Sequence, residues 1–421
     1  MALLRRGSRR RFGAALYFEL RQERLSCVRC TAAVAFRALN CPEKYAAAGK
    51  GDLRDCENVG VMMNYNQIRR KTKKIRVGRV MVGGDAPVAV QSMLNVPGND
   101  YDAVMHQLKA LENAGCDIVR MSVPDMETVR VLGRVKESGF PLTLVADIHF
   151  DYRMAVEAAA AGADKIRINP GNIGSKERIR AVVAACRTHG IPIRIGVNGG
   201  SLEKDLLAKY GAPTAEALAE SARRHISLLE ELDFHDILIA IKSSRVPEMI
   251  RANELIAGQY PYPVHLGVTE AGTPHMGLIK SSVGIGALLC RGIGDTIRVS
   301  LTAPPEEEVR EGKALLRALG MDSSYRMNFV SCPTCGRTRV DIIRIAGEVE
   351  ARAEAEGLTG KPLTVAVMGC AVNGPGEARN ADIGIAGGNG EAILIRKGEI
   401  LRKIPEDRIV DELLEEIRKL Q

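Results

Sequence analysis

Two cysteines three positions apart, Cys332 and Cys335 in the segment CPTCGR, have the spacing of a metal clamp or a redox pair. The C-terminal part of the chain holds one further cysteine, Cys370 in GCAVNGPGEA, but no second CxxC and no histidine. A zinc site saturated by four cysteines, or by two cysteines and two histidines, therefore cannot be assembled there.

A carboxylate, Glu377, follows Cys370 by seven residues, beyond the flexible NGPG turn. Three thiolates and one carboxylate suit a 4Fe-4S cluster whose fourth iron lacks a thiolate. Such an iron is a Lewis acid with an exchangeable coordination position. A zinc site of three cysteines and one glutamate stays an alternative. A disulfide is disfavoured in a reducing compartment, and the chain lacks the CxxxCxxC run of a radical-SAM cluster.

A second set of candidate residues is cationic, and each member lies within a short apolar, β-branched run. Its members are Arg120, Arg167, Arg194, Lys242 and Arg298. If the runs are parallel strands of a barrel, these side chains converge at the face where the strands end. A ring of cations repels itself unless an anion fills it, and guanidinium groups match phosphate oxygens, so a diphosphate is expected. The alternative is that each arginine pairs with a carboxylate or reaches solvent.

Eight strand-like runs would position these side chains. They span 87–94, 118–124, 142–149, 165–171, 191–198, 237–244, 263–270 and 296–301. Most are separated by helical stretches such as TAEALAESARRHISLLEEL (214–232), in which apolar residues recur three and four apart. The alternation predicts an α/β fold with an N-terminal (β/α)8 TIM-like barrel. A doubly wound open sheet is the alternative fold.

The rest of the chain divides at proline-rich and charged stretches. We expect the barrel to occupy residues 63–303 and a connector helix 304–322. We expect a small α+β iron-sulfur domain at 323–421. Its predicted elements are strands at 363–370, 381–387 and 391–401 and an amphipathic helix at 406–420.

Residues 1–62 are expected to be a disordered or spurious extension upstream of a start near Met63. They hold 12 basic and 6 acidic residues, a net charge of +6. Since the whole chain carries +8, residues 63–421 carry only +2. The extension is Arg-rich like a transit peptide, which is the alternative. Its CVRC motif (Cys27, Cys30) has no partner pair, and we interpret it as chance.

Composition excludes several classes of protein. The near-neutral core and the absence of Trp argue against a nucleic-acid partner. No apolar run is long enough to cross a membrane, and ten cysteines in 421 residues do not make a disulfide scaffold. We expect a soluble, cytoplasmic protein. In it, Cys116, Cys186 and Cys290 would be small buried apolar residues.

The motifs together resemble one known family. GGDAPVAVQSM, ADIHFDYR, RINPGNIG, IRIGVNGGSLEKD, HLGVTEAG, CPTCGR and GCAVNGPGEA match the bacterial 4-hydroxy-3-methylbut-2-en-1-yl diphosphate synthases of the non-mevalonate isoprenoid pathway. The match runs from about residue 75 to the C-terminus. The resemblance implies reductive ring opening and dehydration of 2-C-methyl-D-erythritol 2,4-cyclodiphosphate to 4-hydroxy-3-methylbut-2-enyl diphosphate. Two electrons would arrive singly from flavodoxin or ferredoxin through a 4Fe-4S cluster, one per subunit.

The resemblance also assigns roles to residues. Cys332, Cys335, Cys370 and Glu377 match the cluster ligands, and Glu270 matches a carboxylate that assists proton transfer. The substrate-binding matches are Arg120, His149, Arg167, Asn169, Arg194, Asn198, Lys242, Arg298 and Ser300. The stretch QSMLNVPGND (91–100) departs from the family pattern, so no contact is assigned to it. Members of this family are homodimers in which the cluster domain of one subunit covers the barrel of the other.

Three rival functions are weighed against this one. A non-redox 4Fe-4S hydro-lyase acting on a phosphorylated substrate would need no reductant. An iron-sulfur or zinc module that senses redox state or binds RNA would show steeply salt-dependent RNA binding. A zinc-stabilised barrel enzyme would be identified by metal analysis.

Overall fold

The computed structural model describes residues 68–322, 327–372 and 374–420, and not the side chain of Glu377. The predicted extension 1–62, with Cys27 and Cys30, lies outside these residues. Among the described helices, none is both long and apolar enough to span a bilayer.

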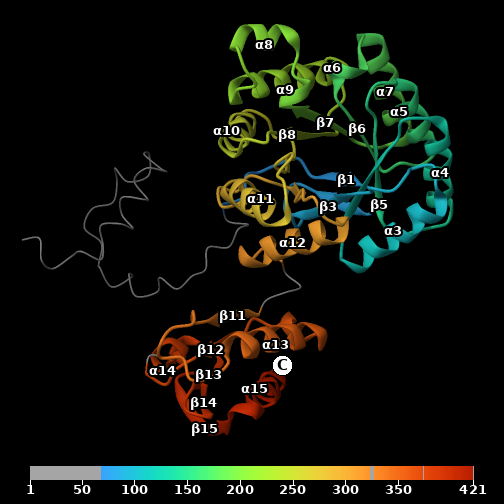
Figure 1. The fold of residues 1–421 in the computed structure, drawn as a ribbon. Coiled ribbons are helices and arrows are strands. Elements are labelled where there is room, and N and C mark those ends of the chain that lie inside the picture. Colours follow the sequence, from blue (N-terminus) through green and yellow to red (C-terminus); the bar gives the residue numbers. More distant parts are fainter. Residues whose placement is uncertain (1–67, 323–326, 373, 421) are drawn as a thin grey trace, which may run out of the picture. The chain divides into compact units, whose positions relative to one another are not determined.

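Eight parallel strands form the first domain (Figure 1). They are β3 (Ala89–Met93), β4 (Ile118–Ser122), β5 (Thr143–Asp147), β6 (Lys165–Ile168), β7 (Ile193–Asn198), β8 (Ile237–Lys242), β9 (His265–Leu266) and β10 (Thr296–Ile297). Their order, β8-β7-β6-β5-β4-β3-β10-β9, follows the chain around a circle, and a parallel bridge between Ile239 and Val264 joins the two ends. The predicted TIM-like barrel is therefore confirmed, because an open doubly wound sheet would reverse its strand order.

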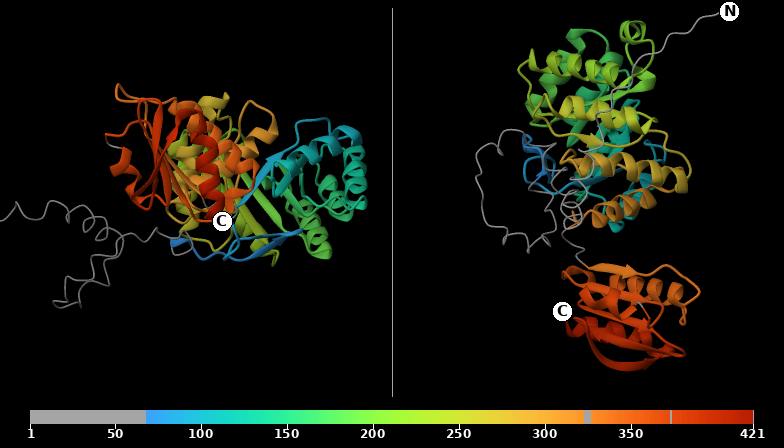
Figure 2. Two further views of the ribbon diagram at one scale, coloured as in Figure 1. Left: turned by 90° about the horizontal axis from the view of Figure 1, so that it is seen from below. Right: turned by 90° about the vertical axis from the view of Figure 1, so that its left-hand side faces the viewer.

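Helices surround the strands, as the views of Figures 1 and 2 show. The long ones are α3 (Tyr101–Asn113), α4 (Met126–Glu137), α5 (Tyr152–Ala160), α7 (Lys176–His189), α9 (Ala215–Glu230), α10 (Val246–Ala257), α11 (Pro274–Leu289) and α12 (Pro305–Ala318). Three begin at aspartate N-caps: Asp100, Asp125 and Asp151 each accept a hydrogen bond from a backbone N–H in the first turn. These caps stand in the loops after β3, β4 and β5, so they also set where each strand-to-helix turn ends.

The barrel interior is layered, because alternate residues of each strand point inward. An apolar cluster of Ala89, Ile118, Val145 and Leu238 fills the amino end. The hairpin of β1 (Ile75–Val77) and β2 (Val80–Val82), which the sequence patterns did not predict, packs against this cluster. Buried polar residues also point into the barrel: Gln91, Lys165, Arg194, His265 and Thr296. The carboxyl ends of the strands contribute the cationic residues.

The second domain is a five-stranded sheet with helices. Its strands are β11 (Asn328–Ser331), β12 (Thr364–Met368), β13 (Ile383–Gly387), β14 (Glu391–Arg396) and β15 (Glu399–Pro405), paired in this order. The first two pairings are parallel and the last two antiparallel. Helices α13 (Ile342–Ala355) and α15 (Ile409–Lys419) share one core with the sheet, and the short helix α14 (Gly374–Glu377) contacts β12 and β13. The predicted α+β domain is confirmed.

Three local predictions were wrong or incomplete. The segment 391–401 is not one strand, because Lys397 and Gly398 both adopt positive φ and turn the chain between β14 and β15. Strand β11 was not predicted, since its four residues are mostly exposed. Cys116 and Cys186 are buried as expected, but Cys290, at the end of α11, is exposed.

Candidate active site

A cavity of about 280 Å³ opens at the carboxyl ends of the barrel strands. It brings together all nine residues that the family motifs match to substrate binding. They are Arg120, His149, Arg167, Asn169, Arg194, Asn198, Lys242, Arg298 and Ser300. We call this cavity the cationic pocket. The structure places these side chains around one cavity. Their contact with a substrate stays a prediction.

Asp147 at the end of β5 anchors one side of the cationic pocket. Its side chain is only 2% exposed, and its carboxylate lies 2.8 Å from Arg167 Nη1 and 3.4 Å from Arg120 Nε. Burial alone would raise the pKa of Asp147, but the charges of Arg120 and Arg167 outweigh it and lower the pKa. The carboxylate is thus ionised and holds both guanidinium groups in place.

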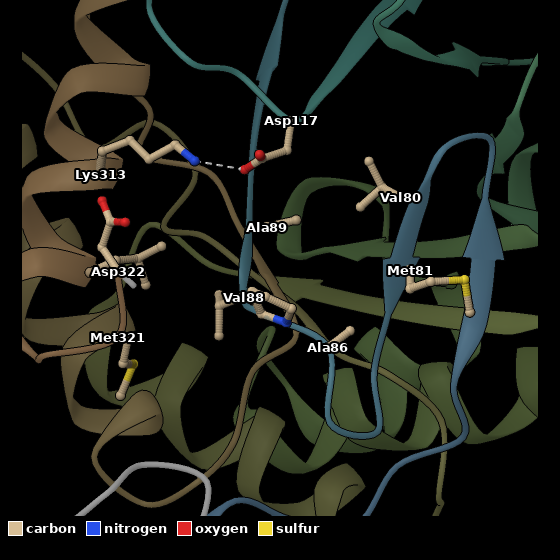
Figure 3. Close-up of a pocket in the computed structure, with 11 residues that line it drawn as sticks. Val80, Met81, Ala86, Val88, Ala89, Asp117, Lys313, Met321 and Asp322 are labelled. Atoms are coloured by element: carbon tan, nitrogen blue, oxygen red, sulfur yellow. Dashed lines mark hydrogen bonds and ion pairs between the residues drawn. The ribbon is translucent and has the colours of Figure 1, made fainter. Parts of the chain in front are cut away.

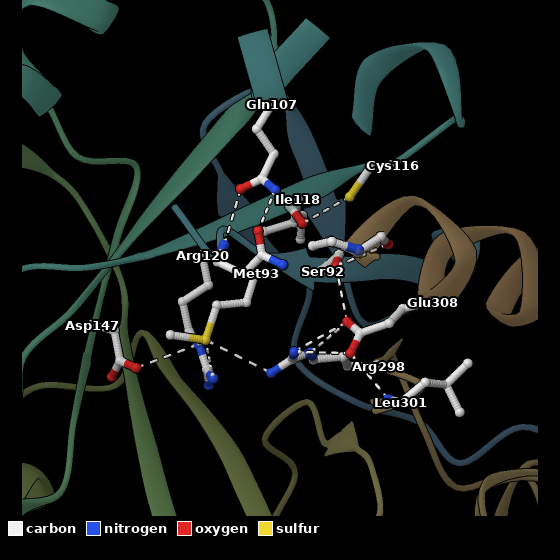
Figure 4. Close-up of polar contacts among 12 residues, drawn as sticks. Ser92, Met93, Gln107, Cys116, Ile118, Arg120, Asp147, Arg298, Leu301 and Glu308 are labelled. Atoms are coloured by element: carbon white, nitrogen blue, oxygen red, sulfur yellow. Dashed lines mark hydrogen bonds and ion pairs between the residues drawn. The ribbon is translucent and has the colours of Figure 1, made fainter. Parts of the chain in front are cut away.

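Glu308 anchors the opposite side from helix α12 (Figure 4). Its buried carboxylate accepts hydrogen bonds from Arg298 Nε at 3.0 Å and Arg298 Nη2 at 3.1 Å. It also accepts one from Ser92 Oγ and one from the backbone N–H of Leu301. Arg298 is therefore fixed by a two-pronged ion pair before any ligand binds.

Met93 lies between the two sides. Arg120 Nε is 3.2 Å and Arg298 Nη1 3.7 Å from its sulfur. Figure 4 shows the sulfur of Met93 in contact with both guanidinium groups. A polarizable thioether separates the two guanidinium groups without pairing with either charge. Neither Met93 nor Glu308 was predicted: Met93 lies in the stretch left unassigned, and Glu308 follows two other glutamates from which its sequence context does not distinguish it.

Two further cations have no carboxylate partner among the described residues. Arg194 is 1% exposed and donates through Nη1 to Gln91 Oε1 at 3.2 Å, and Lys242 is 7% exposed. Burial and the neighbouring arginines lower the pKa of both groups well below their usual values. The cationic pocket therefore holds four guanidinium groups and one amine against two carboxylates, and an anion would relieve the excess of basic groups.

Two glycine-containing loops, residues 169–174 after β6 and 198–201 at the end of β7, contribute to the wall of the cationic pocket. Asn169 begins the short helix α6 (Pro170–Ile173), and its Oδ1 accepts from the N–H of Gly171 at 3.1 Å. Its Nδ2 donates to Oγ of Ser201, in the second turn, at 2.9 Å. The amide of Asn169 thus ties the loop after β6 to the loop after β7.

Glu270 lines an adjoining cavity of about 480 Å³ that shares Asn198, Ser201 and Thr269 with the cationic pocket. The side chain is exposed, and the backbone has φ of +51°, in the left-handed region. A residue with a Cβ is strained there by about 1–2 kcal/mol. The fold therefore holds a carboxylate in an unfavourable conformation at the rim of the pocket, which is where such strain usually serves a function.

A third cavity, of about 330 Å³, lies at the amino end of the barrel, beside Ala89 at the start of β3 (Figure 3). Its wall is mostly apolar, and its polar residues include the ion pair of Lys313 with Asp117 at 3.0 Å. Barrel enzymes place their chemistry at the other face, so this cavity is not the candidate active site.

The cysteines follow neighbouring parallel strands of the second domain. Cys332 comes directly after β11, and Cys370 two residues after β12. The N–H of Cys332 donates to Val367 O, and the N–H of Gly369 donates to Cys332 Sγ at 3.2 Å. The loop that carries Cys335 is tied to the same turn, because Arg339 N–H donates to Gly369 O. Three cysteine residues are thereby placed at one end of the sheet, beyond the carboxyl ends of β11 and β12.

Three cysteine thiols and one glutamate carboxylate are the types of ligand that an iron-sulfur cluster with one open iron position requires. Cys332 is half-buried, Cys370 buried and Cys335 exposed, and helix α14, which begins four residues after Cys370, ends at Glu377. Hydrogen bonds from the N–H and side chain of Arg337 lower the pKa of the Cys335 thiol. Within the described residues, no three His, Cys, Asp or Glu side chains are grouped closely enough to hold a metal ion. The ligand assignment therefore stays a prediction.

Comparison with known proteins covers both domains. The family model described as GcpE TIM-barrel domain matches residues 72–313, and the model described as GcpE protein C-terminal domain matches residues 328–419.

Relatives named 4-hydroxy-3-methylbut-2-en-1-yl diphosphate synthase (flavodoxin) are similar over almost their whole length. The protein from Clostridium tetani is 53% identical over 352 residues, which cover 84% of this chain and 99% of that protein. The protein from Clostridium acetobutylicum is 56% identical over 349 residues, covering 83% and 99%. Among solved structures, a type I 3-dehydroquinate dehydratase from Clostridium difficile aligns with a TM-score of 0.44 at 17% identity, covering 59% of this chain and 98% of that one.

Proposed function

Because the chain belongs to the GcpE family, we propose that its barrel and its C-terminal domain together carry out the reaction for which its relatives are named. The chain is an iron-sulfur oxidoreductase. It reductively converts 2-C-methyl-D-erythritol 2,4-cyclodiphosphate to 4-hydroxy-3-methylbut-2-enyl diphosphate, with flavodoxin as electron donor.

The observation that carries the proposal is the excess of positive charge in the cationic pocket. Five buried or half-buried cations face two carboxylates in about 280 Å³, at the barrel face where active sites lie. Asp147 and Glu308 prevent three arginines from turning away, so the pocket is arranged for an anion before one arrives. A diphosphate, with its many acceptor oxygens, matches this set of donors.

The cofactor proposed is one 4Fe-4S cluster per subunit, held by Cys332, Cys335, Cys370 and Glu377. When bound, such a cluster supplies electrons singly and one iron with an exchangeable position. The chain's own residues do the rest: the arginines and Lys242 orient the diphosphate, and Asn169 and Asn198 complete the rim. Glu270 holds a proton for transfer at the edge of the pocket.

The assembly proposed is a homodimer in which each cluster domain serves the barrel of the partner subunit. We propose domain boundaries of 63–303 and 323–421, with 304–322 between them. Helix α12, within that middle segment, packs against β3. We place the enzyme in the cytoplasm, where thiols stay reduced, and ferredoxin remains an alternative donor to flavodoxin.

The test is anaerobic purification followed by iron, sulfide and zinc analysis. We expect about four iron and four sulfide per chain and a brown absorbance. Adding the cyclodiphosphate with a reductant should change the absorbance and release the linear diphosphate. Product formation without any reductant would favour a hydro-lyase, and zinc in place of iron would contradict the cofactor assignment.

A matched pair of variants tests the ligands. Cys370→Ser should remove the absorbance and the activity together, because a cluster ligand is lost. Cys290→Ser changes an exposed cysteine of the barrel domain and should preserve both. A Cys370→Ser protein that stays colourless yet turns over normally would refute the ligand assignment.

A further inference from the structure

A buried amine lies beneath the cationic pocket and has no role in the proposed reaction. Lys165, at the start of β6, is 0% exposed, and its Nζ has no hydrogen-bond partner among the described residues. It lies two residues before Arg167 on the inward face of the same strand, so it points into the barrel. A lysine buried in this way is rare and costly unless it is paired or has lost its proton.

The groups around Lys165 favour the neutral amine. Arg194 on β7, Arg120 on β4 and His265 on β9 act on it as cations or potential cations, and β5 faces it with the apolar Val145. The adjacent carboxylate of Asp164 is occupied outside the barrel, where it pairs with Lys136 at 2.7 Å and accepts from the N–H of Leu144. Burial, then Arg194 and Arg120, lower the pKa of Lys165 well below its usual value.

The neighbouring polar atoms are also short of acceptors. Gln91 Nε2, Arg194 Nε and His265 Nε2 are buried and have no partner within the part of the chain that the structure describes. His265 Nδ1 lies 2.8 Å from Thr296 Oγ1, so its ring is fixed by one nitrogen only. Gln91 Nε2 and Arg194 Nε can only donate, so a further positive charge beside them would be unfavourable.

We propose that Lys165 is a proton-storing group of the pocket, neutral in the free enzyme and protonated when a diphosphate binds above it. Guanidinium groups cannot release or take up protons, so the arginines of the pocket carry fixed charge. An amine can change its charge by gaining or losing a proton. Lys242, the amine that lines the pocket itself, is retained in every variant, so its proton uptake is common to wild type and the Lys165 variants. The lone pair of Lys165 Nζ accepts one proton that the acid form of the buffer releases, and no bond of the ligand breaks.

This inference rests on the proposed function, in which the pocket holds a phosphate-bearing substrate. Ring opening of a cyclic diphosphate frees one more phosphate oxygen, so the product is more anionic than the substrate. A site with fixed charge would fit only one of the two. If the extent of protonation of Lys165 follows the charge of the bound ligand, it is smaller with the cyclic substrate than with the linear product, and the pocket can match both. Lys165 is then a charge-adjusting residue and not a group that touches substrate.

The test is calorimetric binding of inorganic pyrophosphate to the anaerobically purified full chain, in two buffers of different ionisation enthalpy at one pH. The difference in heat gives the protons taken up. We expect wild type to take up more protons than Lys165→Met, by up to about one per pyrophosphate. Protons exchanged by pyrophosphate itself are the same in both proteins and cancel.

The pH dependence gives a second measurement. Binding to wild type should tighten as pH falls, by up to about tenfold per pH unit more than binding to Lys165→Met. Lys176→Met, which removes an exposed amine of α7 that pairs with Glu231 at the surface, is the matched control and should behave as wild type. Lys165→Gln keeps a polar group at the site and serves if the Met variant does not fold.

Each outcome decides between the two proposals. Equal proton uptake by wild type and both Lys165 variants would overturn the role of Lys165 and leave the pocket assignment intact. Failure of wild type to bind pyrophosphate would overturn both. Reduced uptake in the Lys165 variants, with normal uptake in Lys176→Met, would establish the role.

Discussion

The arginines of the cationic pocket that pair with a carboxylate keep both their charge and their position when no ligand is bound. Burial lowers the pKa of Arg120 to about 10, which still leaves it fully charged at neutral pH, and Asp147 opposes the shift. Asp147 and Glu308 hold arginines in defined positions and neutralise only part of the charge. Preorganisation of this kind removes the cost of ordering long side chains when the ligand binds.

Glu270 is the residue whose backbone strain calls for a chemical explanation. Glu270→Gln keeps the size and the exposed position of the side chain but cannot carry a transferable proton. We expect turnover to fall by about a hundredfold or more, the usual contribution of a general acid or base, with the cluster absorbance unchanged. Steady-state kinetics with the cyclodiphosphate measure the effect.

The control is Glu248→Gln, which changes a carboxylate in the wall of the same adjoining cavity. Glu248 pairs with Arg245 at 2.8 Å, at the exposed start of α10. We expect its turnover to stay near that of wild type. Equal kinetics for Glu270→Gln and wild type would remove Glu270 from the reaction.

At the scale of elements, strand β7 makes room for the pocket by means of a glycine. A Cβ at Gly196 would lie 2.6 Å from Arg167 Nε and 2.7 Å from Nη2. The backbone itself does not demand glycine, since Gly196 does not have positive φ. The space that a side chain of residue 196 would fill is occupied by the guanidinium of Arg167, which comes from the neighbouring strand and reaches Asp147.

We expect Gly196→Ala to act on Arg167 more than on the fold. The new methyl group would meet the far end of a flexible side chain and push Arg167 away from Asp147. Loss of one charge-assisted phosphate contact should weaken pyrophosphate binding by roughly tenfold or more. Gly286→Ala, where a Cβ would meet nothing within 4 Å, is the control. Equal affinities of the two variants would show that Arg167 does not contact the ligand.

Helix α12 contributes the buried carboxylate of Glu308 to the barrel. Removing this carboxylate should lower the free energy of unfolding by a measurable amount. Glu308→Ala leaves Arg298 without its carboxylate and the N–H of Leu301 without an acceptor. We expect the free energy of unfolding to fall by about 3–5 kcal/mol, as for other broken buried ion pairs. Glu307→Ala, one residue earlier and exposed, should change it by less than about 0.5 kcal/mol. Denaturant melts that give the same midpoint for both variants would contradict this account.

The sequence predicted the elements with a strong pattern and missed those without one. Runs such as 237–244 are rich in β-branched residues because strand β8 is buried on both faces, so they are recognisable. Strands β1 and β11 have three and four residues, too few for a period to be visible. Strand β15 was merged with β14 because only Lys397 and Gly398 separate their pattern.

The site was predictable where a residue ends a recognisable strand. The five basic residues Arg120, Arg167, Arg194, Lys242 and Arg298 were all found from the strand pattern, and the family motifs supplied their assignment to substrate binding. Glu308 was missed because it acts from a helix distant in sequence, where three consecutive glutamates look alike. The special character of Lys165 was also invisible: a lysine that begins a strand is usually at the surface, and only closure of the barrel buries it.

At the scale of the whole molecule, the two proposed halves of the chemistry belong to separately packed domains. The barrel has its own hydrophobic core, and the C-terminal domain has another, built on Val365, Ile383 and Leu413 among others. A variant of the pocket should therefore leave the cluster intact, and a variant of the cluster should leave the pocket intact. This independence permits a test of the proposed exchange of domains between subunits.

We expect two inactive variants to restore activity when they are mixed, if subunits are first dissociated and allowed to reassociate. Arg194→Ala impairs the pocket and Cys370→Ser the cluster. If each site combines a barrel and a cluster domain from different subunits, a mixed dimer has one intact site and one doubly impaired site. Since half of the dimers in an equal mixture are mixed, activity should reach roughly a quarter of that of wild type. A mixture as inactive as its components, with dimer exchange verified by differently tagged chains, would mean that both domains of a site come from one chain.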